Sequence, residues 1–371
     1  MKSITPSERE TALKVMAELA ELAEPSFKEF KTTAYIKEFL ESIGITPDNV
    51  YETGIWGTVD NGSDKTVALR SDIDALPFNE DKTEYRHLCG HNHNMTAVLM
   101  ALKWIMENRD SLNVNIRYIF QPAEEMVSGA STMIERGCLE GVSCIYAMHA
   151  ENEIPVGRAG VVRGPCMAGS NHFDIVFKGS ATHAALPHKG TDTVSAAAYY
   201  INNAQTIVGR LCNPTMPALI SFGSINGGSA ANILPDSVRV MGTFRHFHLE
   251  IKEALVDGMQ RLCASVKELF GVEAHLTIKD GTPPVVNDRE LAEGIIERLD
   301  ADLRFSFDKP SMGGEDFAFY LEHVPGVFIW SGANESGSHP PLHSPDFYVP
   351  DETVVTSMRI MRCVLDGYMK G

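Results

Sequence analysis

Apolar residues recur at helical spacing in two stretches near the start of the chain. The first begins at Thr5-Pro6-Ser7-Glu8, where a capping residue, a proline at the first helical position and a glutamate at the third predict a helix to about Leu22. The second covers residues 27–43, with apolar side chains at 30, 35, 36, 39, 40 and 43 and a stop at Gly44. Both stretches are predicted to be helices.

Three short apolar runs are predicted to be buried strands, and each one leads into chemically active side chains. The runs cover residues 66–70, 114–120 and 144–148. They are followed by Asp72 and Asp74, by Glu124 and Glu125, and by His149. Strands that alternate with helices predict an α/β layer with a mostly parallel sheet. Ligands of such sheets bind beyond the carboxyl ends of the strands, so these three strand ends are candidates for one site.

The pattern of elements changes at about residue 170. Strands are expected at residues 172–178, 218–225, 237–245 and 273–279, and helices at residues 191–211 and 249–270. This β-α-β-β-α-β order is typical of a ferredoxin-like unit. Glycine and proline at 164–165 and 281–284 are plausible hinges. We therefore expect an α/β catalytic domain from residues 1–168 and 283–371, with an inserted ferredoxin-like α+β domain at residues 169–282.

The composition indicates a globular protein with two domains. The 371 residues exceed the roughly 250–300 at which a single core stops growing, and 44% of them are hydrophobic. Seven scattered cysteines favour reduced thiols in the cytoplasm. We expect a soluble, non-secreted protein, because the N-terminal residues lead into a polar helix and no apolar run approaches the roughly 18 residues that could span a membrane. A net charge of −17 argues against nucleic acid and membrane surfaces as partners.

The segment Cys89-Gly90-His91-Asn92-His93-Asn94 places one thiol and two imidazoles directly before an apolar run at helical spacing, residues 95–102. The cluster is therefore expected at a helix N-terminus, where the helix dipole favours the thiolate. Thiolate and neutral imidazole are ligands that zinc and similar ions accept. These residues alone are equally compatible with a buried cysteine and two surface histidines.

Several motifs in chain order resemble one family. They are Leu69-Arg70-Ser71-Asp72-Ile73-Asp74-Ala75-Leu76-Pro77, Cys89-Gly90-His91, Gln121-Pro122-Ala123-Glu124-Glu125, His149, Ala181-Thr182-His183-Ala184-Ala185-Leu186-Pro187-His188 and Leu342-His343-Ser344-Pro345. Together they resemble the aminoacylase and carboxypeptidase family of metal-dependent hydrolases. Within this family the motifs resemble the branch that includes N-acetyldiaminopimelate deacetylase, hippurate hydrolase and the plant auxin-conjugate hydrolases.

The resemblance implies a site for two divalent metal ions (zinc, manganese or cobalt) in the first domain. Its implied ligands are Cys89, His91, Glu125, His149 and His343. Glu124 would be the general base. Asp72 lies at the other active-site acid position. Together with Asp74, it could orient the ligand side chains without contacting the metal ions. His339 shares the loop of His343, and only the Leu-His-Ser-Pro match selects His343.

For the inserted domain, the resemblance implies contacts with substrate and with a second subunit of a homodimer. His183 aligns with a histidine that reaches the partner's active site and hydrogen-bonds the developing oxyanion. Asn232 and Arg245 match positions that hold the α-carboxylate of the substrate, which an arginine fork can bind bidentately. Hinge closure between the domains is then expected during turnover.

The chain departs from the family pattern at two places. Relatives usually continue Cys-Gly-His with Asp, any residue and His, whereas positions 92 and 94 here are both asparagine. Asn94 is expected to cap the following helix, and His93, shifted by one position, is not assigned as a ligand. In residues 23–27 the chain lacks the arginine and histidine that often precede the Pro-Glu segment of relatives.

We therefore predict a metal-dependent amidohydrolase that cleaves an N-acetyl or aromatic acyl L-amino acid to a carboxylate and a free amino acid. Alternatives within the family are N-acetyldiaminopimelate deacetylase and a dipeptidase. An alternative of another class is a weakly active or non-catalytic binding homologue, which Asn92 and Asn94 would explain.

Overall fold

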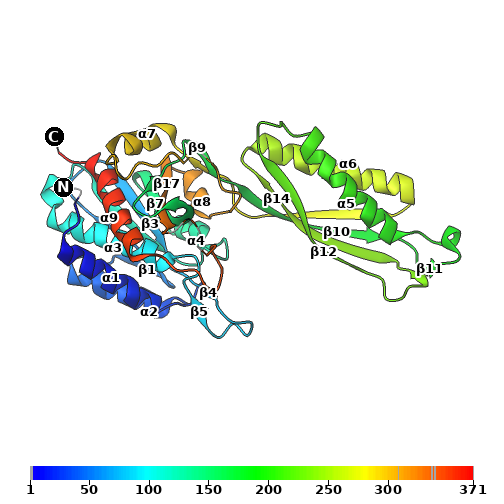
Figure 1. The fold of residues 1–371 in the computed structure, drawn as a ribbon, viewed down its shortest axis with the longest axis horizontal. Coiled ribbons are helices and arrows are strands. Elements are labelled where there is room, and N and C mark those ends of the chain that lie inside the picture. The colour runs from blue at the N-terminus through cyan, green and yellow to red at the C-terminus, as the bar shows by residue number, and fades with distance from the viewer. Residues whose placement is uncertain (1–2, 308, 336, 338–339, 371) are drawn as a thin grey trace. The chain divides into compact units, whose positions relative to one another are not determined.

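The computed structural model describes residues 3–307, 309–335, 337 and 340–370. The chain divides into two compact units (Figure 1). The first unit comprises Met1–Cys166, Val286–Pro310 and Glu315–Gly371, and the second comprises Met167–Val285 and Ser311–Gly314. The chain leaves the first unit after Cys166 and returns to it at Val286. The expected domain bounds stay a prediction.

A mixed sheet forms the centre of the first unit, with seven strands in the part of the chain that is described. Its spatial order is β1 (Asn49–Tyr51), β2 (Gly54–Val59), β6 (Asn115–Gln121), β3 (Thr66–Asp72), β7 (Val142–Pro155), β17 (Gly326–Asn334) and β8 (Ala159–Gly160). β6, β3, β7 and β17 pair in parallel, whereas β1, β2 and β8 pair antiparallel. The expected α/β class with a mostly parallel sheet is therefore confirmed.

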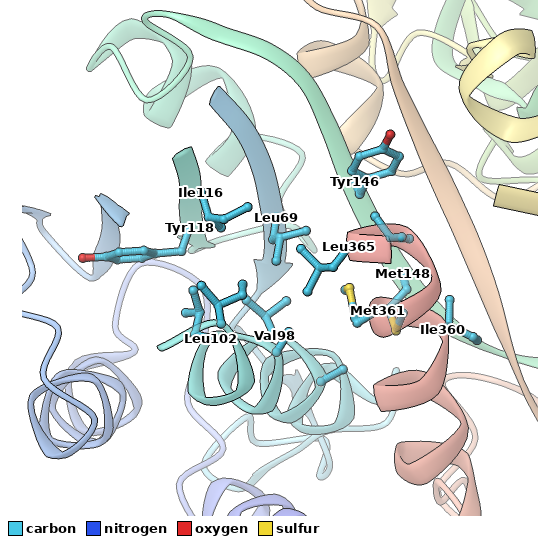
Figure 2. Packing of buried hydrophobic residues seen from close by; sticks show 14 of the residues in the cluster. Leu69, Val98, Leu102, Ile116, Tyr118, Tyr146, Met148, Ile360, Met361 and Leu365 are labelled. Carbon is cyan, nitrogen blue, oxygen red and sulfur yellow. The ribbon is translucent and has the colours of Figure 1, made fainter. Parts of the chain in front are cut away.

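Helices cover both faces of this sheet. α3 (His91–Glu107) and α9 (Asp351–Asp366) pack on one face, and in Figure 2 Leu69 of β3 lies beside Val98 and Leu365 from these helices. Side chains alternate along a strand, so Phe328 of β17 points to the other face. There its ring lies 5.7 Å from that of Phe317 in α8 (Phe317–Leu321). The central strands are buried on both sides, as their continuous apolar runs predict.

The remaining elements of the first unit lie around this sheet. They are α1 (Pro6–Ala20), α2 (Phe30–Ser42), α4 (Gly129–Glu135), α7 (Arg289–Arg298), the short strands β4 (Leu76–Pro77) and β5 (Tyr85–Arg86), and the 3-10 turn Arg109–Ser111. The predicted start of the first helix is confirmed, because Thr5 and Glu8 form a reciprocal capping box. The short strands β9 (Gly164–Met167) and β16 (Val285–Asn287) lie where the chain passes between the two units.

An antiparallel sheet with two helices forms the second unit. The spatial order is β12 (Ala218–Gly227), β14 (Ser237–His246), β10 (Gly169–Lys178) and β15 (Glu273–Asp280), with helices α5 (Thr193–Arg210) and α6 (Leu249–Phe270). Short strands β11 (Thr182–His183) and β13 (Ile233–Leu234) pair with each other, and Pro187–Lys189 forms a 3-10 turn. The ferredoxin-like prediction is confirmed, and the helix expected at residues 249–270 has those bounds.

Other features of the chain bear on the remaining expectations. All seven cysteines are free thiols. Within the described ranges, we find no helix with the length and apolar character needed to cross a bilayer. The cytoplasmic location stays a prediction.

The strand expected at residues 144–148 is longer than predicted. β7 continues to Pro155 because β17 stays paired with it, from Gly326 opposite Ile145 to Asn334 opposite Pro155. His149 therefore lies within a strand. It nevertheless comes just after β3 leaves β7, since the last β3 partner is Ala147.

Candidate metal centre

Three neighbouring strands and one helix bring the predicted ligands together in the first unit. β3 ends at Asp72, and β6 ends at Gln121, just before Glu124 and Glu125. His149 belongs to β7, which is the other neighbour of β3. α3 begins at His91, two residues after Cys89, so the Cys89–His91 segment lies at a helix N-terminus as the sequence predicts. Parallel strands end at the same edge of a sheet, so this arrangement follows from the strand order.

The ligand atoms of the five predicted residues lie close together. Within each of two groups, Cys89–His91–His149 and Cys89–Glu125–His343, these atoms lie within 4.8 Å of one another. The Cys89 sulfur is 3.4 Å from His149 Nε2 and 3.2 Å from His343 Nε2. Glu125 Oε1 is 3.9 Å from His91 Nε2 and 3.8 Å from His343 Nε2. Cys89 therefore connects two groups of possible ligands.

Two of the imidazoles are already oriented by the backbone. His91 Nδ1 is 2.9 Å from the Asp74 carbonyl oxygen, and His149 Nδ1 is 2.8 Å from the Ala150 carbonyl oxygen. A carbonyl oxygen only accepts, so each Nδ1 carries a hydrogen, and Nε2 has a lone pair for a metal ion when the ring is neutral. Such a bond on the other ring nitrogen is the usual arrangement of a metal-binding histidine.

The donor set fits a divalent metal ion. His91 Nε2 and Glu125 Oε1 are buried and have no hydrogen-bond partner among the described residues. Burial, followed by the charge of Cys89, raises the pKa of Glu125 to about 7. Burial would also raise the pKa of the Cys89 thiol, but the charge of His149 and its hydrogen bond outweigh that and lower the pKa. Mixed sulfur, nitrogen and oxygen ligands suit zinc, manganese or cobalt.

Glu124 lies beside this cluster and is nearly fully buried. Its carboxylate is within 4.8 Å of both His91 and Glu125, and in a second group within 4.8 Å of Glu315 and Asp316. Burial raises its pKa well above the ordinary value, and the like charges of Glu315 and Asp316 raise the pKa further. A carboxyl group beside possible ligands whose proton affinity is raised can exchange a proton with a nearby water molecule.

A buried arginine connects β3 with the start of α8. The Arg70 guanidinium donates to Asp72 Oδ2 at 2.9 Å, to Glu315 Oε1 at 2.9 Å and to Asp316 Oδ1 at 2.8 Å. Its Nε also donates to Gln121 Oε1 at 2.8 Å. All these side chains are buried. Sequence reasoning missed this network; the signals were Arg70 two residues before Asp72 and the adjacent acids of Gly313-Gly314-Glu315-Asp316.

Asp72 is held as a carboxylate by its neighbours. Burial alone would raise its pKa, but the charges of His91 and Arg70 outweigh that and lower the pKa to about 2. Asn94 Nδ2 donates to Asp72 Oδ1 at 2.8 Å. The prediction that Asn94 caps a helix is wrong, because α3 begins at His91 with Gly90 at the capping position. Asn94 lies in the first turn and uses its amide for Asp72 instead.

The turn at Gly90 requires glycine. Gly90 has φ +82°, a left-handed conformation, and a Cβ at this position would come within 2.9 Å of Val349 Cγ2. Side chains larger than hydrogen are strained there. Glycine between Cys89 and His91 therefore lets both neighbours enter the cluster.

The loop before α2 supports the turn that carries Glu124, a role that sequence reasoning missed. Ser26 Oγ donates to Asp74 Oδ2 at 2.7 Å, and the Glu125 amide donates to the same oxygen at 3.1 Å. Glu29 Oε1 accepts the amide of Ala123 at 3.0 Å. Ala123 has φ +52°, so this bond stabilises a strained residue next to Glu124.

His87 lies close to the cluster, with its ring 6.4 Å from that of His91, but it differs from the predicted ligands. His87 has two buried ring nitrogens without a partner in the described structure, and burial, followed by the charge of His91, lowers its pKa to about 3. Sequence reasoning assigned no role to His87. His343, in contrast, lies in the cluster with φ +67°, whereas its loop neighbour His339 lies outside the described residues.

The other predicted residues belong to the second unit. The amide of Ala184 donates to the Asn232 carbonyl at 2.9 Å, which brings exposed His183 and exposed Asn232 together. Arg245 is half-buried on β14, and no hydrogen bond or ion pair is found for it among the described residues. Burial lowers its pKa.

Comparison with known protein families decides the classification. Residues 68–366 match the family described as peptidase family M20/M25/M40. The chain belongs to this family. The predicted resemblance is confirmed, and so is the prediction of an enzyme that hydrolyses amide bonds.

Individual M20 relatives cover nearly the whole chain. An N-acetyl-L-cysteine deacetylase of Bacillus subtilis (strain 168) is 38% identical over 350 residues, which are 91% of this chain and 83% of the relative. An IAA-amino acid hydrolase of Arabidopsis thaliana, ILR1-like 2, is 32% identical over 382 residues, 96% of this chain and 85% of the relative. The crystal structure of a dinuclear metal-binding M20 peptidase from Bacillus subtilis has a TM-score of 0.85 and 29% identity, and covers 98% of this chain and 99% of that one.

Proposed function

We propose that the protein is a metal-dependent amidohydrolase that cleaves an N-acyl L-amino acid into a carboxylate and a free amino acid. The observation that carries this proposal is the convergence of the five ligand side chains with Glu124 buried beside them. The similarity to an N-acetyl-L-cysteine deacetylase supports an acetyl group as the acyl part. The similarity to an IAA-amino acid hydrolase keeps aromatic acyl groups as a second candidate.

The residues of the cluster would divide the work as follows. Cys89, His91, Glu125, His149 and His343 would hold two divalent ions, which is the number in the dinuclear relative. When bound, such ions act as Lewis acids on the amide carbonyl and make nearby water more acidic. Glu124 would accept the proton of the water whose oxygen adds to the carbonyl carbon. It would pass that proton to the amine nitrogen as the C–N bond breaks.

Substrate binding is proposed for three residues of the second unit, His183, Asn232 and Arg245. The guanidinium of Arg245 has no partner among the described residues and would donate hydrogen bonds to the α-carboxylate. Asn232 would add an amide donor to that carboxylate, and His183 would donate to the carbonyl oxygen as it becomes negative. We further propose a homodimer formed through the inserted domain, in which His183 serves the partner subunit's site.

A substrate panel tests this function. We expect the full-length protein, supplied with zinc, manganese or cobalt, to release amine from N-acetyl-L-cysteine and N-acetyl-L-methionine faster than from dipeptides, and EDTA to stop the release. Amine release is followed with a fluorogenic amine reagent. Faster cleavage of dipeptides would instead assign a peptidase. No cleavage with any ion, in protein that binds two ions, would assign the binding homologue suggested by Asn92 and Asn94.

Replacing Arg245 with methionine tests the proposed carboxylate site. We expect KM for N-acetyl amino acids to rise about 10- to 100-fold, because a charged hydrogen-bond pair is worth about 1.5–3 kcal/mol. The matched control is Arg239→Met on the same strand, whose exposed guanidinium pairs with half-buried Asp174, and it should leave KM unchanged. With N-acetyl amino acid amides, which lack the carboxylate, Arg245→Met and the wild type should be alike. If the variant and the wild type have equal KM values for N-acetyl amino acids, Arg245 does not bind the carboxylate.

A further inference from the structure

Four buried polar side chains form a continuous hydrogen-bonded chain from α9 to β3. Ser357 Oγ lies 2.7 Å from His93 Nε2, and His93 Nδ1 lies 3.1 Å from Asn94 Oδ1. Asn94 Nδ2 completes the chain by donating to Asp72 Oδ1 at 2.8 Å. Each of the four side chains is 1% exposed or less. Buried polar groups need protein partners, so each link depends on the next.

The chemistry of the links determines their direction. The Asp72 carboxylate can only accept, so the amide nitrogen of Asn94 must face it and the amide oxygen must face His93. That oxygen can also only accept, so the hydrogen of His93 lies on Nδ1. His93 Nε2 can then accept the Ser357 hydroxyl hydrogen. The side chain of Asn94 therefore has one orientation that satisfies both of its neighbours.

This series of hydrogen bonds ends at Asp72 Oδ1, whereas Arg70 donates to the other carboxylate oxygen, Oδ2. Arg70 Nη1 donates to Asp72 Oδ2 at 2.9 Å, and the same oxygen is 3.9 Å from His91 Nε2. Both carboxylate oxygens thus have a fixed donor, and the plane of the carboxylate is set beside His91. Two donors from different elements are needed for this, because a single one would leave the group free to turn about its bond.

We propose that Asn94 is a positioning residue that fixes the Asp72 carboxylate beside His91, and that His93 and Ser357 hold the Asn94 amide in the required orientation. The inference rests on the proposed function, since His91 is one of the proposed metal ligands. Relatives usually have a histidine at this position, and an imidazole N–H could likewise donate to Asp72. His93 is accordingly a support for Asn94 and makes no contact with the ligand atoms.

A double-mutant cycle tests the inference with metal affinity as its readout. Affinity of full-length protein for Mn²⁺ is measured by competition with a fluorescent chelator, in Asn94→Leu, Asp72→Asn and the double variant. We expect Asn94→Leu to weaken binding about 10- to 100-fold, the usual effect of removing a group that orients a ligand. In the Asp72→Asn background it should change binding less than about 3-fold, because residues that act through each other are not additive.

Matched variants separate positioning from a general loss of structure. Asn92→Leu removes an amide two residues away whose one donor bond among the described residues goes to the Met16 carbonyl, and it should keep wild-type affinity. Asn94→His should restore most of the affinity. If Asn94→Leu does not fold, His93→Phe takes its place in the same cycle. Equal losses in both Asp72 backgrounds, or no loss at all, would overturn the inference. A wild type that binds Mn²⁺ but cleaves no amide would contradict only the proposed function.

Discussion

Replacing Glu124 with glutamine is expected to lower kcat by about 10²- to 10⁴-fold, the range for loss of a general acid–base group. Glutamine keeps the shape of the side chain but cannot accept and return a proton. The content of bound metal should stay that of the wild type, because Glu124 is not one of the five proposed ligands. The measurement is kcat on an N-acetyl amino acid at saturating metal, together with metal content by emission spectroscopy.

The control for this variant is Glu135→Gln, the same change at an exposed glutamate of α4 in the same region of the chain. It should leave kcat within about 2-fold of the wild type, since surface substitutions have small effects. Retention of more than a tenth of wild-type kcat in Glu124→Gln would contradict the proton-transfer role.

Replacing Arg70 with methionine is expected to lower the free energy of unfolding by about 3–5 kcal/mol, which is the usual cost of breaking a buried ion pair. Asp72, Glu315 and Asp316 would all lose the cation that they share. The measurement is urea unfolding followed by circular dichroism. Arg163→Met is the control, because the exposed pair of Arg163 with Glu293 should contribute only about 0–1 kcal/mol.

The pH dependence of the Arg70 variant gives a second check. In the wild type the charge of Arg70 lowers the pKa of Asp72 and of Asp316. Without this cation both pKa values rise, so the folded variant binds protons more tightly than the folded wild type. The stability of the variant, relative to that of the wild type, then falls as pH rises. We expect the difference from the wild type to be larger at pH 8 than at pH 5. A difference that is independent of pH would mean that Arg70 acts by packing alone.

The sequence was sufficient to predict the layers of the fold because the signals are local. Periodic apolar residues and caps predict α1 and α6, and apolar runs predict β3 and β6. β7 was predicted too short because its extension depends on pairing with β17, which lies far away in the sequence. Local patterns contain no information on such a partner.

The candidate site was predictable only in part, for the same reason. The five ligand positions were implied by the family resemblance, and the structure brings their atoms together. The groups that orient them were missed, because Arg70 meets Glu315 across 245 residues and Glu29 meets Ala123 across 94. Asn94 was misread as a helix cap, since its partner Asp72 belongs to another element. The roles of the five residues as ligands, of Glu124 as the base and of the second unit's residues as substrate contacts stay predictions.

The most direct test of the proposed two-metal site is the metal content of the purified full-length protein at saturating Mn²⁺. It is measured by emission spectroscopy for the wild type, Cys89→Ala and Cys138→Ala. Cys89 belongs to both ligand groups, whereas Cys138 is a buried thiol outside them. The account predicts two ions per chain for the wild type and Cys138→Ala, and fewer than two for Cys89→Ala. A wild-type chain that binds no ion, or a Cys89→Ala chain that still binds two, would contradict it.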